Sequence, residues 1–521
     1  MGNRLGNQLA CKHNMGGIYM DMKNLAIGAL VIIAIGLFAF NFIAPREQVY
    51  RLEAPINLKE EAKLASSDSP TGIELTIYQV EPNYYAYRAA NNFDINNGLA
   101  LIKEMRSANL ASGLTKFQMK GTAQYLDSTS LHLKDLTDGG TQVLEQNYQY
   151  DLVSSQKLME KFIDKEIEVI MATGNGNGAA ALESVRGKLL SYTDGLVLQT
   201  PTGIATLKDY VKINYPVLPE GLITSPTVEW LISNSKAGNH DFQVSYLASG
   251  LNWNADYVAI ANKDDSLLDI TGWVSIKNLA GATFENAKLK LVAGEINLVR
   301  AASRGGYYEK SMVADAYAGA SAPQFAEEGL FEYHLYTLQR PATLKNSEDK
   351  QITLFDAKAT PVQKQFVYEG DGTKVKTKLI FENSKENNLG LPMPKGKVRV
   401  YKADSEGQLQ FLGEDQIEHT PENEKVRLFL GNAFDIVAEK KQTDRKEIGT
   451  CSSQFSYSVE IRNHKKENAE VTVLQNVYGE SSIVTENFQS VKESSSQFSW
   501  KVPVKADSSS TLTYTLLQRY C

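Results

Sequence analysis

The sequence has 521 residues, of which 42% are hydrophobic and 22% are charged, so it is long enough for two to four domains with ordinary cores. Its formal net charge is −7, which argues against a nucleic-acid partner because phosphate binding needs clustered lysine and arginine side chains. The three cysteines, Cys11, Cys451 and Cys521, are too few for a disulfide-rich scaffold.

Residues 25–44 form an apolar run without a charged side chain, LAIGALVIIAIGLFAFNFIA. A helix rises about 1.5 Å per residue, so a run of this length can cross the hydrocarbon core of a bilayer. A cleaved signal peptide usually has a shorter apolar region that ends at a small-residue cleavage site, and this run has no such ending. We therefore predict a transmembrane signal anchor over residues 24–45, which would hold the chain in a membrane.

Lysine and arginine residues occur on both sides of this run, so their distribution does not choose its orientation. The short tail at residues 1–23 and the long β-rich remainder favour an N-terminus inside the cell. We therefore expect a single-pass protein of the cell membrane. Its C-terminal ectodomain would lie outside the cytoplasm, in the periplasm or in the extracellular space.

A polar stretch at residues 46–71 follows the apolar run and is expected to form a stalk. Residues 72–222 should then form an N-terminal β-rich domain, because runs such as Ile73–Gln79 alternate between apolar and polar side chains. The stretch Asp151–Phe162 within this domain is predicted to be a helix. Asp-Gly between short apolar runs is a strong hairpin signal, and it predicts a small inserted barrel over about residues 165–215.

Residues 223–360 are predicted to form a central β-sandwich and residues 361–521 a C-terminal one, because short alternating runs recur with turn residues between them. Trp253 and Trp273 are expected to be large aromatic anchors of the central sheet. The predicted fold class is therefore mainly β, with an N-terminal transmembrane helix followed by two or three antiparallel β-sandwich or small-barrel domains.

Several stretches of the chain resemble, in the same order, a bacterial family called domain of unknown function 4139, which is also met in mucoidy-inhibitor-related proteins. They are Tyr246–Arg300, EYHLYTLQRPATL, LGLPMPKGKVRVYK, DQIEHTPENEKVRLFLGNAFDIVAEKKQTD and TLTYTLLQRY. The resemblance implies a β-rich fold and export from the cytoplasm. Because the family's function is uncharacterised, the resemblance implies no catalytic residue.

Gly174, Gly176 and Ala179 follow a predicted strand with the spacing of a dinucleotide-binding turn. Such a turn must open a helix whose N-terminus holds the pyrophosphate. The residues that follow predict two strands joined by Asp-Gly instead of alternating strands and helices. We therefore interpret the glycines as a hairpin tip and predict no cofactor.

The six histidines include no HExxH pattern and no pair four residues apart, so the sequence predicts no metal site. His334 shares its strand face with Glu332 and Tyr336, for which a histidine satisfied within the sheet is the simpler interpretation. Asn262–Asp269 carries three carboxylates and could attract calcium, but it lacks the central glycine of an EF-hand loop. A solvated loop is the alternative there.

Tyr84, Tyr85, Tyr87, Tyr307 and Tyr308 are candidate surface aromatics that could stack on sugars or on a protein partner, or could cover nearby core. Cys451 and Cys521 would share an oxidising compartment in an exported protein and could form a disulfide there; two unpaired thiols are the alternative.

The leading hypothesis is a membrane-anchored protein of the cell envelope with a binding, adhesion or structural and assembly role, acting on a protein or glycan partner and not as an enzyme. No catalytic residues are predicted. The alternative is an envelope polysaccharide-acting hydrolase, or a regulator of surface polysaccharide. Assembly into a homo-oligomer through sheet edges is a third hypothesis.

Overall fold

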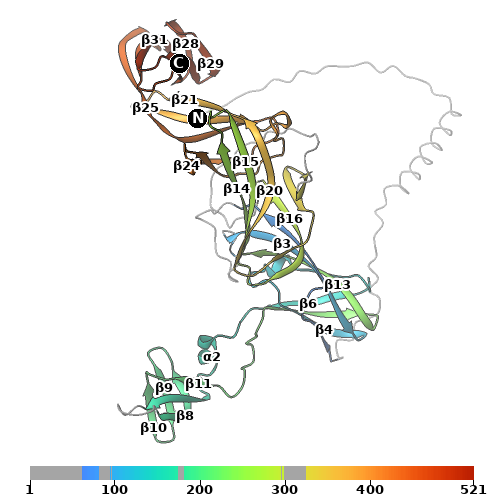
Figure 1. The fold of residues 1–521 in the computed structure, drawn as a ribbon. Helices are drawn as coiled ribbons and strands as arrows, with labels where there is room; N and C mark the ends of the chain where they lie inside the picture. Colours follow the sequence, from blue (N-terminus) through green and yellow to red (C-terminus); the bar gives the residue numbers. More distant parts are fainter. Residues whose placement is uncertain are drawn as a thin grey trace, which may run out of the picture. The chain divides into compact units, whose positions relative to one another are not determined.

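The computed structural model describes residues 61–80, 94, 97–173, 181–294, 296–297 and 324–520, all within the compact unit Leu58–Cys521. Strands make up nearly all of the regular structure in these ranges, which confirms the predicted mainly β class (Figure 1). None of their helices is long and apolar enough to cross a membrane. The predicted anchor at residues 24–45 lies outside the described residues, and so does most of the predicted stalk.

Two sheets are built from strands of the first two thirds of the chain. The four-stranded sheet has the order β1 (Lys63–Ser67), β4 (Gly113–Lys120), β12 (Thr227–Asn234) and β6 (Gln142–Gln149). The eight-stranded sheet has the order β17 (Phe325–Leu330), β18 (Tyr333–Leu338), β16 (Phe284–Ala293), β2 (Gly72–Tyr78), β3 (Leu99–Leu110), β13 (Gly238–Ser249) and β5 (His132–Asp135), and β19 (Ala342–Leu344) pairs with β16. Most pairs are antiparallel, but β1 runs parallel to β4 and β16 runs parallel to β2.

A third sheet has five strands. Its order is β20 (Glu348–Pro361), β15 (Leu267–Asn278), β14 (Leu251–Ala261), β23 (Gly396–Ala403) and β24 (Leu409–Ile417). Its inward side chains share one continuous hydrophobic core with the two sheets above, in which Phe117, Trp230 and Trp253 are fully buried. The strands alternate buried and exposed positions because successive side chains point to opposite faces.

The predicted inserted module has a core of its own. Its five antiparallel strands have the order β10 (Gly203–Leu207), β9 (Leu196–Thr200), β8 (Ala181–Ser191), β7 (Glu166–Thr173) and β11 (Lys212–Asn214). The chain enters and leaves it side by side, because the Val153 amide donates to the Ile223 carbonyl at 3.0 Å. The predicted helix over Asp151–Phe162 is shorter than expected: α2 spans Ser155–Lys161 after the N-cap Ser154.

A nine-stranded sheet contains most of the C-terminal part. Its order is β28 (Glu480–Glu486), β31 (Ser508–Arg519), β26 (Ser452–Asn463), β25 (Lys425–Gly449), β22 (Lys374–Glu382), β21 (Gln363–Tyr368), β27 (Ala469–Asn476), β30 (Gln497–Val504) and β29 (Ser490–Ser494). Trp500 and Tyr514 stack in its core, with ring centroids 4.3 Å apart. Two short 3₁₀ helices, η2 (Ser128–Ser130) and η3 (Lys385–Asn387), complete the described secondary structure.

Strand pairing crosses the domain boundaries that the sequence predicted at residues 222/223 and 360/361. Strand β12 lies between β4 and β6 of the N-terminal part, and β23 pairs with β14 of the central part. The two tryptophans of the central sheet lie on opposite faces. Trp253 is fully buried in the core, whereas Trp273 lies opposite Asp256 on the partly exposed outer face of the same sheet.

Candidate functional site

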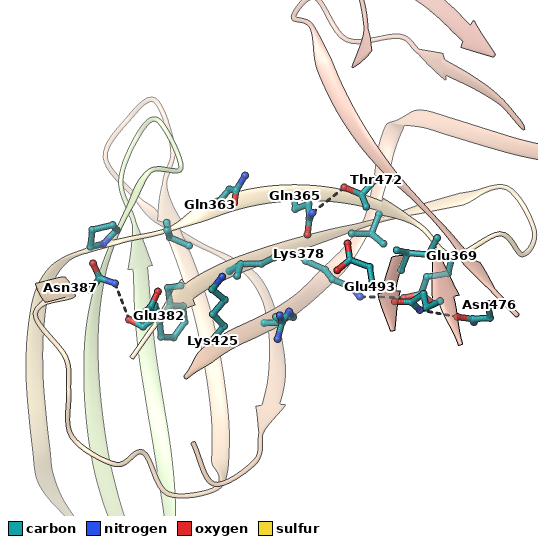
Figure 2. A pocket seen from close by; sticks show the side chains of 18 residues that line it. Gln363, Gln365, Glu369, Lys378, Glu382, Asn387, Lys425, Thr472, Asn476 and Glu493 are labelled. Atoms are coloured by element: carbon teal, nitrogen blue, oxygen red, sulfur yellow. Dashed lines mark hydrogen bonds and ion pairs between the residues drawn. The ribbon is translucent and has the colours of Figure 1, made fainter. Parts of the chain in front are cut away.

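An open cleft of about 960 Å³ crosses one face of the C-terminal sheet and is lined mainly by polar side chains (Figure 2). Its floor is made by strands β25, β22, β21 and β27, with β29 and β30 at one end. Gln363 and Gln365 face the cleft from β21, and Lys378 and Glu382 face it from β22. The cleft therefore collects side chains from strands that are far apart in sequence.

Strand alternation explains why these polar side chains share a face. On β21, Phe366 and Tyr368 pack on the C-terminal core, so Gln363 and Gln365, an odd number of positions away, must point to the other face. Strand β22 behaves likewise, because Leu379 is buried on the opposite face. The register then sets Gln365 directly opposite Lys378.

Some of the cleft side chains are bonded to one another. The Gln365 amide donates to Thr472 Oγ1 at 3.0 Å, and the Gln497 amide donates to Asn476 Oδ1 at 2.8 Å. These are single contacts within side chains that have several donors and acceptors each. The amides therefore keep hydrogen-bonding capacity toward the cleft.

The charges at one end of the cleft balance each other, because the carboxylates of Glu369 and Glu493 offset the two lysines Lys376 and Lys378. Glu369 accepts from Lys376 Nζ at 2.5 Å and from Lys378 Nζ at 3.3 Å. The hydrogen bond from Lys376 is the main reason why the pKa of Glu369 lies below its ordinary value, and the bond from Lys378 adds to it. Glu369 is therefore a carboxylate at neutral pH, held in an ion-pair network.

The other end of the cleft carries the exposed cations Lys425 and Arg427 from β25. Neither forms an ion pair within 4.0 Å with any residue that the structure describes. Glu382 lies opposite Lys425 in the strand register, without such a contact. This end therefore differs in charge balance from the Glu369 end.

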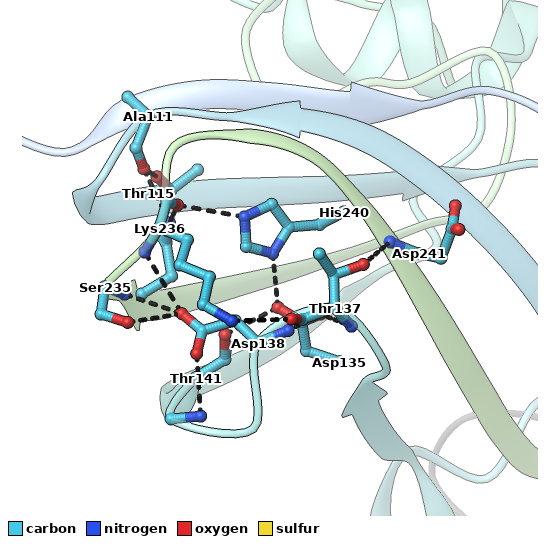
Figure 3. Close-up of polar contacts among 12 residues, drawn as sticks. Ala111, Thr115, Asp135, Thr137, Asp138, Thr141, Ser235, Lys236, His240 and Asp241 are labelled. Atoms are coloured by element: carbon cyan, nitrogen blue, oxygen red, sulfur yellow. Dashed lines mark hydrogen bonds and ion pairs between the residues drawn. The ribbon is translucent and has the colours of Figure 1, made fainter.

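A second polar cluster lies where β5, β13 and the loop after β12 meet (Figure 3). His240 is 1% exposed, and its Nδ1 lies 2.6 Å from Asp135 Oδ2. Its Nε2 lies 3.0 Å from the Lys236 carbonyl oxygen. Both ring nitrogens of His240 therefore have partners inside the chain, a carboxylate oxygen and a backbone carbonyl oxygen.

Asp138 in the same cluster is saturated with donors. Its carboxylate accepts from the Gly140 amide at 3.0 Å, from the Ser235 hydroxyl at 2.8 Å and from the amides of Ser235 and Lys236. These bonds, the one from Gly140 first, lower the pKa of Asp138 to about 2. Thr141, His240 and nearby amides bond Asp135 and hold its pKa below the ordinary value, although burial alone would raise it.

A third polar group is enclosed between the first two sheets. Arg106 donates two hydrogen bonds to Glu104, and Tyr246 donates to the other carboxylate oxygen at 2.5 Å. All three side chains are nearly inaccessible to solvent. Like the His240 cluster, this group has its hydrogen-bond partners inside the chain.

Many of the residues that the sequence singled out lie outside the part of the chain that the structure describes. The tyrosines at 84, 85, 87, 307 and 308 lie outside the described residues, as do Cys521 and the glycines at 174 and 176. Cys451 is disulfide-bonded. The stretch that would have been the dinucleotide-binding helix is the strand β8.

The candidate metal ligands are engaged in other contacts. His334 Nδ1 lies 2.7 Å from Glu327 Oε1 across the β17–β18 hairpin. Asp265, in the loop considered for calcium, accepts from Lys364 at 2.8 Å and from Lys402 at 2.5 Å. Within the described ranges no group of three or more histidine, cysteine, aspartate or glutamate side chains could hold a metal ion.

A scan against protein-family models found no matching family, and a search of the curated proteins found no matching protein. The resemblance to the domain of unknown function 4139 therefore stays a prediction. The cleft residues were missed by sequence reasoning, although Gln363 and Gln365 give a polar alternation on one strand. That pattern is typical of any solvated strand, so it indicates a cleft only when β22, β25 and β27 are placed beside it.

Proposed function

We propose that this protein is a binding protein of the cell envelope that holds a hydroxyl-rich glycan in the cleft without cleaving it. The observation that carries the proposal is the open polar cleft of about 960 Å³, whose walls present amide and hydroxyl side chains. Side-chain amides donate and accept hydrogen bonds at once, and so do sugar hydroxyls. The cleft chemistry therefore matches a polyhydroxylated chain.

A peptide is the less suitable occupant. Extended peptides usually bind a sheet by pairing with a strand whose backbone groups are free. Strand β21, in the middle of the cleft floor, is already hydrogen-bonded to β22 on one side and to β27 on the other. The β27 pairing covers Phe366–Tyr368, so at that part of the floor β21 offers side chains and not backbone groups.

The carboxylate chemistry of the cleft favours binding over hydrolysis. A glycoside hydrolase needs one carboxyl group with a raised pKa to act as the acid. The pKa of Glu369 is lowered, so Glu369 does not suit that role. The hydrolase alternative would need Glu382 and Glu493, and turnover of the glycan is the outcome that would favour it.

Export is proposed on the disulfide at Cys451 together with the apolar run at residues 25–44. The Tyr520 amide donates to the Cys451 carbonyl at 2.9 Å, so the next residue along the chain, Cys521, is the proposed disulfide partner. Disulfides persist in oxidising compartments outside the cytoplasm. Mass spectrometry without reductant should find a peptide that links the two cysteines, whereas alkylation of both thiols in the native protein would contradict the pairing.

The binding proposal is tested with the full-length protein in lipid nanodiscs and a panel of immobilised polysaccharides. The variant with Gln363→Ala and Gln365→Ala should bind at least about tenfold more weakly, because it removes two hydrogen-bonding side chains worth about 1 kcal/mol each. Gln416→Ala on β24 is the matched control, since that amide is exposed but lies outside the cleft. Equal binding by both variants would contradict the proposal, and release of glycan fragments would favour the hydrolase.

A further inference from the structure

We propose that the glycan held in the cleft is acidic, and that Lys425 and Arg427 bind its anionic groups. This inference rests on the proposed function, because it assigns a ligand class to the same cleft. The observation is the uneven charge balance of the two ends. The Glu369 end is neutralised within the chain, whereas the Lys425 and Arg427 end has an excess of positive charge.

The two cations are held in place by the strand that carries them. Val426 and Leu428, which alternate with them on β25, are 3% and 0% exposed and belong to the large core. Residues 425 and 427 must therefore both point to the cleft face, two positions apart on one strand. The backbone is fixed further by pairing with β22, where Arg427 lies opposite Ile380.

Some other cations on the strand faces of this protein have carboxylate partners. Arg399 on the central sheet lies 3.6 Å from Asp256 and 3.3 Å from Glu414, and Lys378 in the cleft pairs with Glu369. By contrast, the part of the chain that the structure describes supplies no ion-pair partner for Lys425 or Arg427. Glu382 contributes one negative charge nearby, which leaves a surplus of one positive charge at this end.

A carboxylate-bearing sugar fits this charge pattern and the neighbouring amides. The guanidinium group of Arg427 has a planar fork of donors that matches a carboxylate, and Lys425 adds a point charge beside it. The amides Gln363 and Gln365 lie on the same face and can bond the sugar hydroxyls. An acidic glycan would thus use the charged end for its anionic groups and the amide rows for its hydroxyls.

The test compares an oligogalacturonate with its methyl ester, which differs from it in charge while keeping the same sugar ring. Binding to the full-length protein in nanodiscs is measured by calorimetry at low and high salt. We expect the acid to bind at least tenfold more tightly than the ester, with an affinity that falls as salt is added. Arg427→Gln should remove most of this preference, whereas Lys446→Gln, an exposed site on the same strand but outside the cleft, should leave it unchanged.

The outcomes separate the two proposals. Equal affinity for acid and ester, unaffected by Arg427→Gln, would overturn the acidic-glycan inference and leave the glycan-binding function in place. Failure of every glycan on the polysaccharide panel to bind would overturn the function itself. Tighter binding of polyglutamate than of oligogalacturonate would overturn the inference in favour of an acidic polypeptide.

Discussion

The cleft and the His240 cluster are both rich in polar side chains, yet they differ in where those side chains find partners. In the cluster, the side chains of Asp135, Asp138 and His240 are nearly inaccessible to solvent, and other atoms of the same chain bond them (Figure 3). In the cleft, Lys425 and Arg427 are exposed and have no ion pair within the described ranges. The comparison teaches that polar residues indicate a binding site when some of their donors and acceptors have no partner in the same chain. They indicate a structural role when all of these groups are already hydrogen-bonded within the chain.

The largest expected effect comes from breaking the buried cluster. His240→Ala should lower the free energy of unfolding by about 3–5 kcal/mol, because it leaves the Asp135 carboxylate buried without its partner. The measurement is urea unfolding followed through fluorescence, with hydrogen exchange of β5 and β13 as a local readout.

His334→Ala is the matched control for that substitution. His334 also lies 2.7 Å from a carboxylate, that of Glu327, but its side chain is 43% exposed, so the loss should stay below about 1 kcal/mol. Equal losses of unfolding free energy from the two substitutions would mean that burial does not distinguish polar groups that stabilise the fold from those that do not.

Acid should weaken the cluster next. The pKa of Asp138 is about 2 in the folded protein and near its ordinary value of 3.8 in the unfolded chain, so the unfolded chain binds more protons between these values. The stability that Asp138 supplies is therefore present above about pH 4 and is lost as the pH falls toward 2. Hydrogen exchange of β5 and the loop after it should speed up over this interval.

Asp138→Asn is the control for the acid response, because it cannot titrate. Its hydrogen exchange in this region should be faster at neutral pH and should change less between pH 4 and pH 2 than that of the unchanged protein. A variant with the same acid response as the unchanged protein would show that other carboxylates produce it.

The sequence predicted the strands well where side chains alternate on a half-buried sheet, as in β14, and it located the inserted module through the turn at Asp194-Gly195. It did not predict that β16 pairs with β2, or β23 with β14, because such partners are far apart along the chain and no local pattern records them. It also did not predict that Trp253 is fully buried while Trp273 is partly exposed, because alternation gives two faces, but which face is covered depends on the strands that pack there. The cleft needs four such strands together, so the sequence could not reveal it.

The smallest expected effect on stability comes from a cleft residue. It tests the comparison with the His240 cluster, because a binding residue should affect binding more than stability. Arg427→Gln should change the free energy of unfolding by no more than about 0.5 kcal/mol, because the side chain is exposed and has no ion-pair partner in the described part of the chain. The same substitution should nevertheless weaken binding of an acidic glycan about tenfold. A large loss of stability with unchanged binding would place Arg427 with the structural residues, since its bonding capacity would then be used inside the fold.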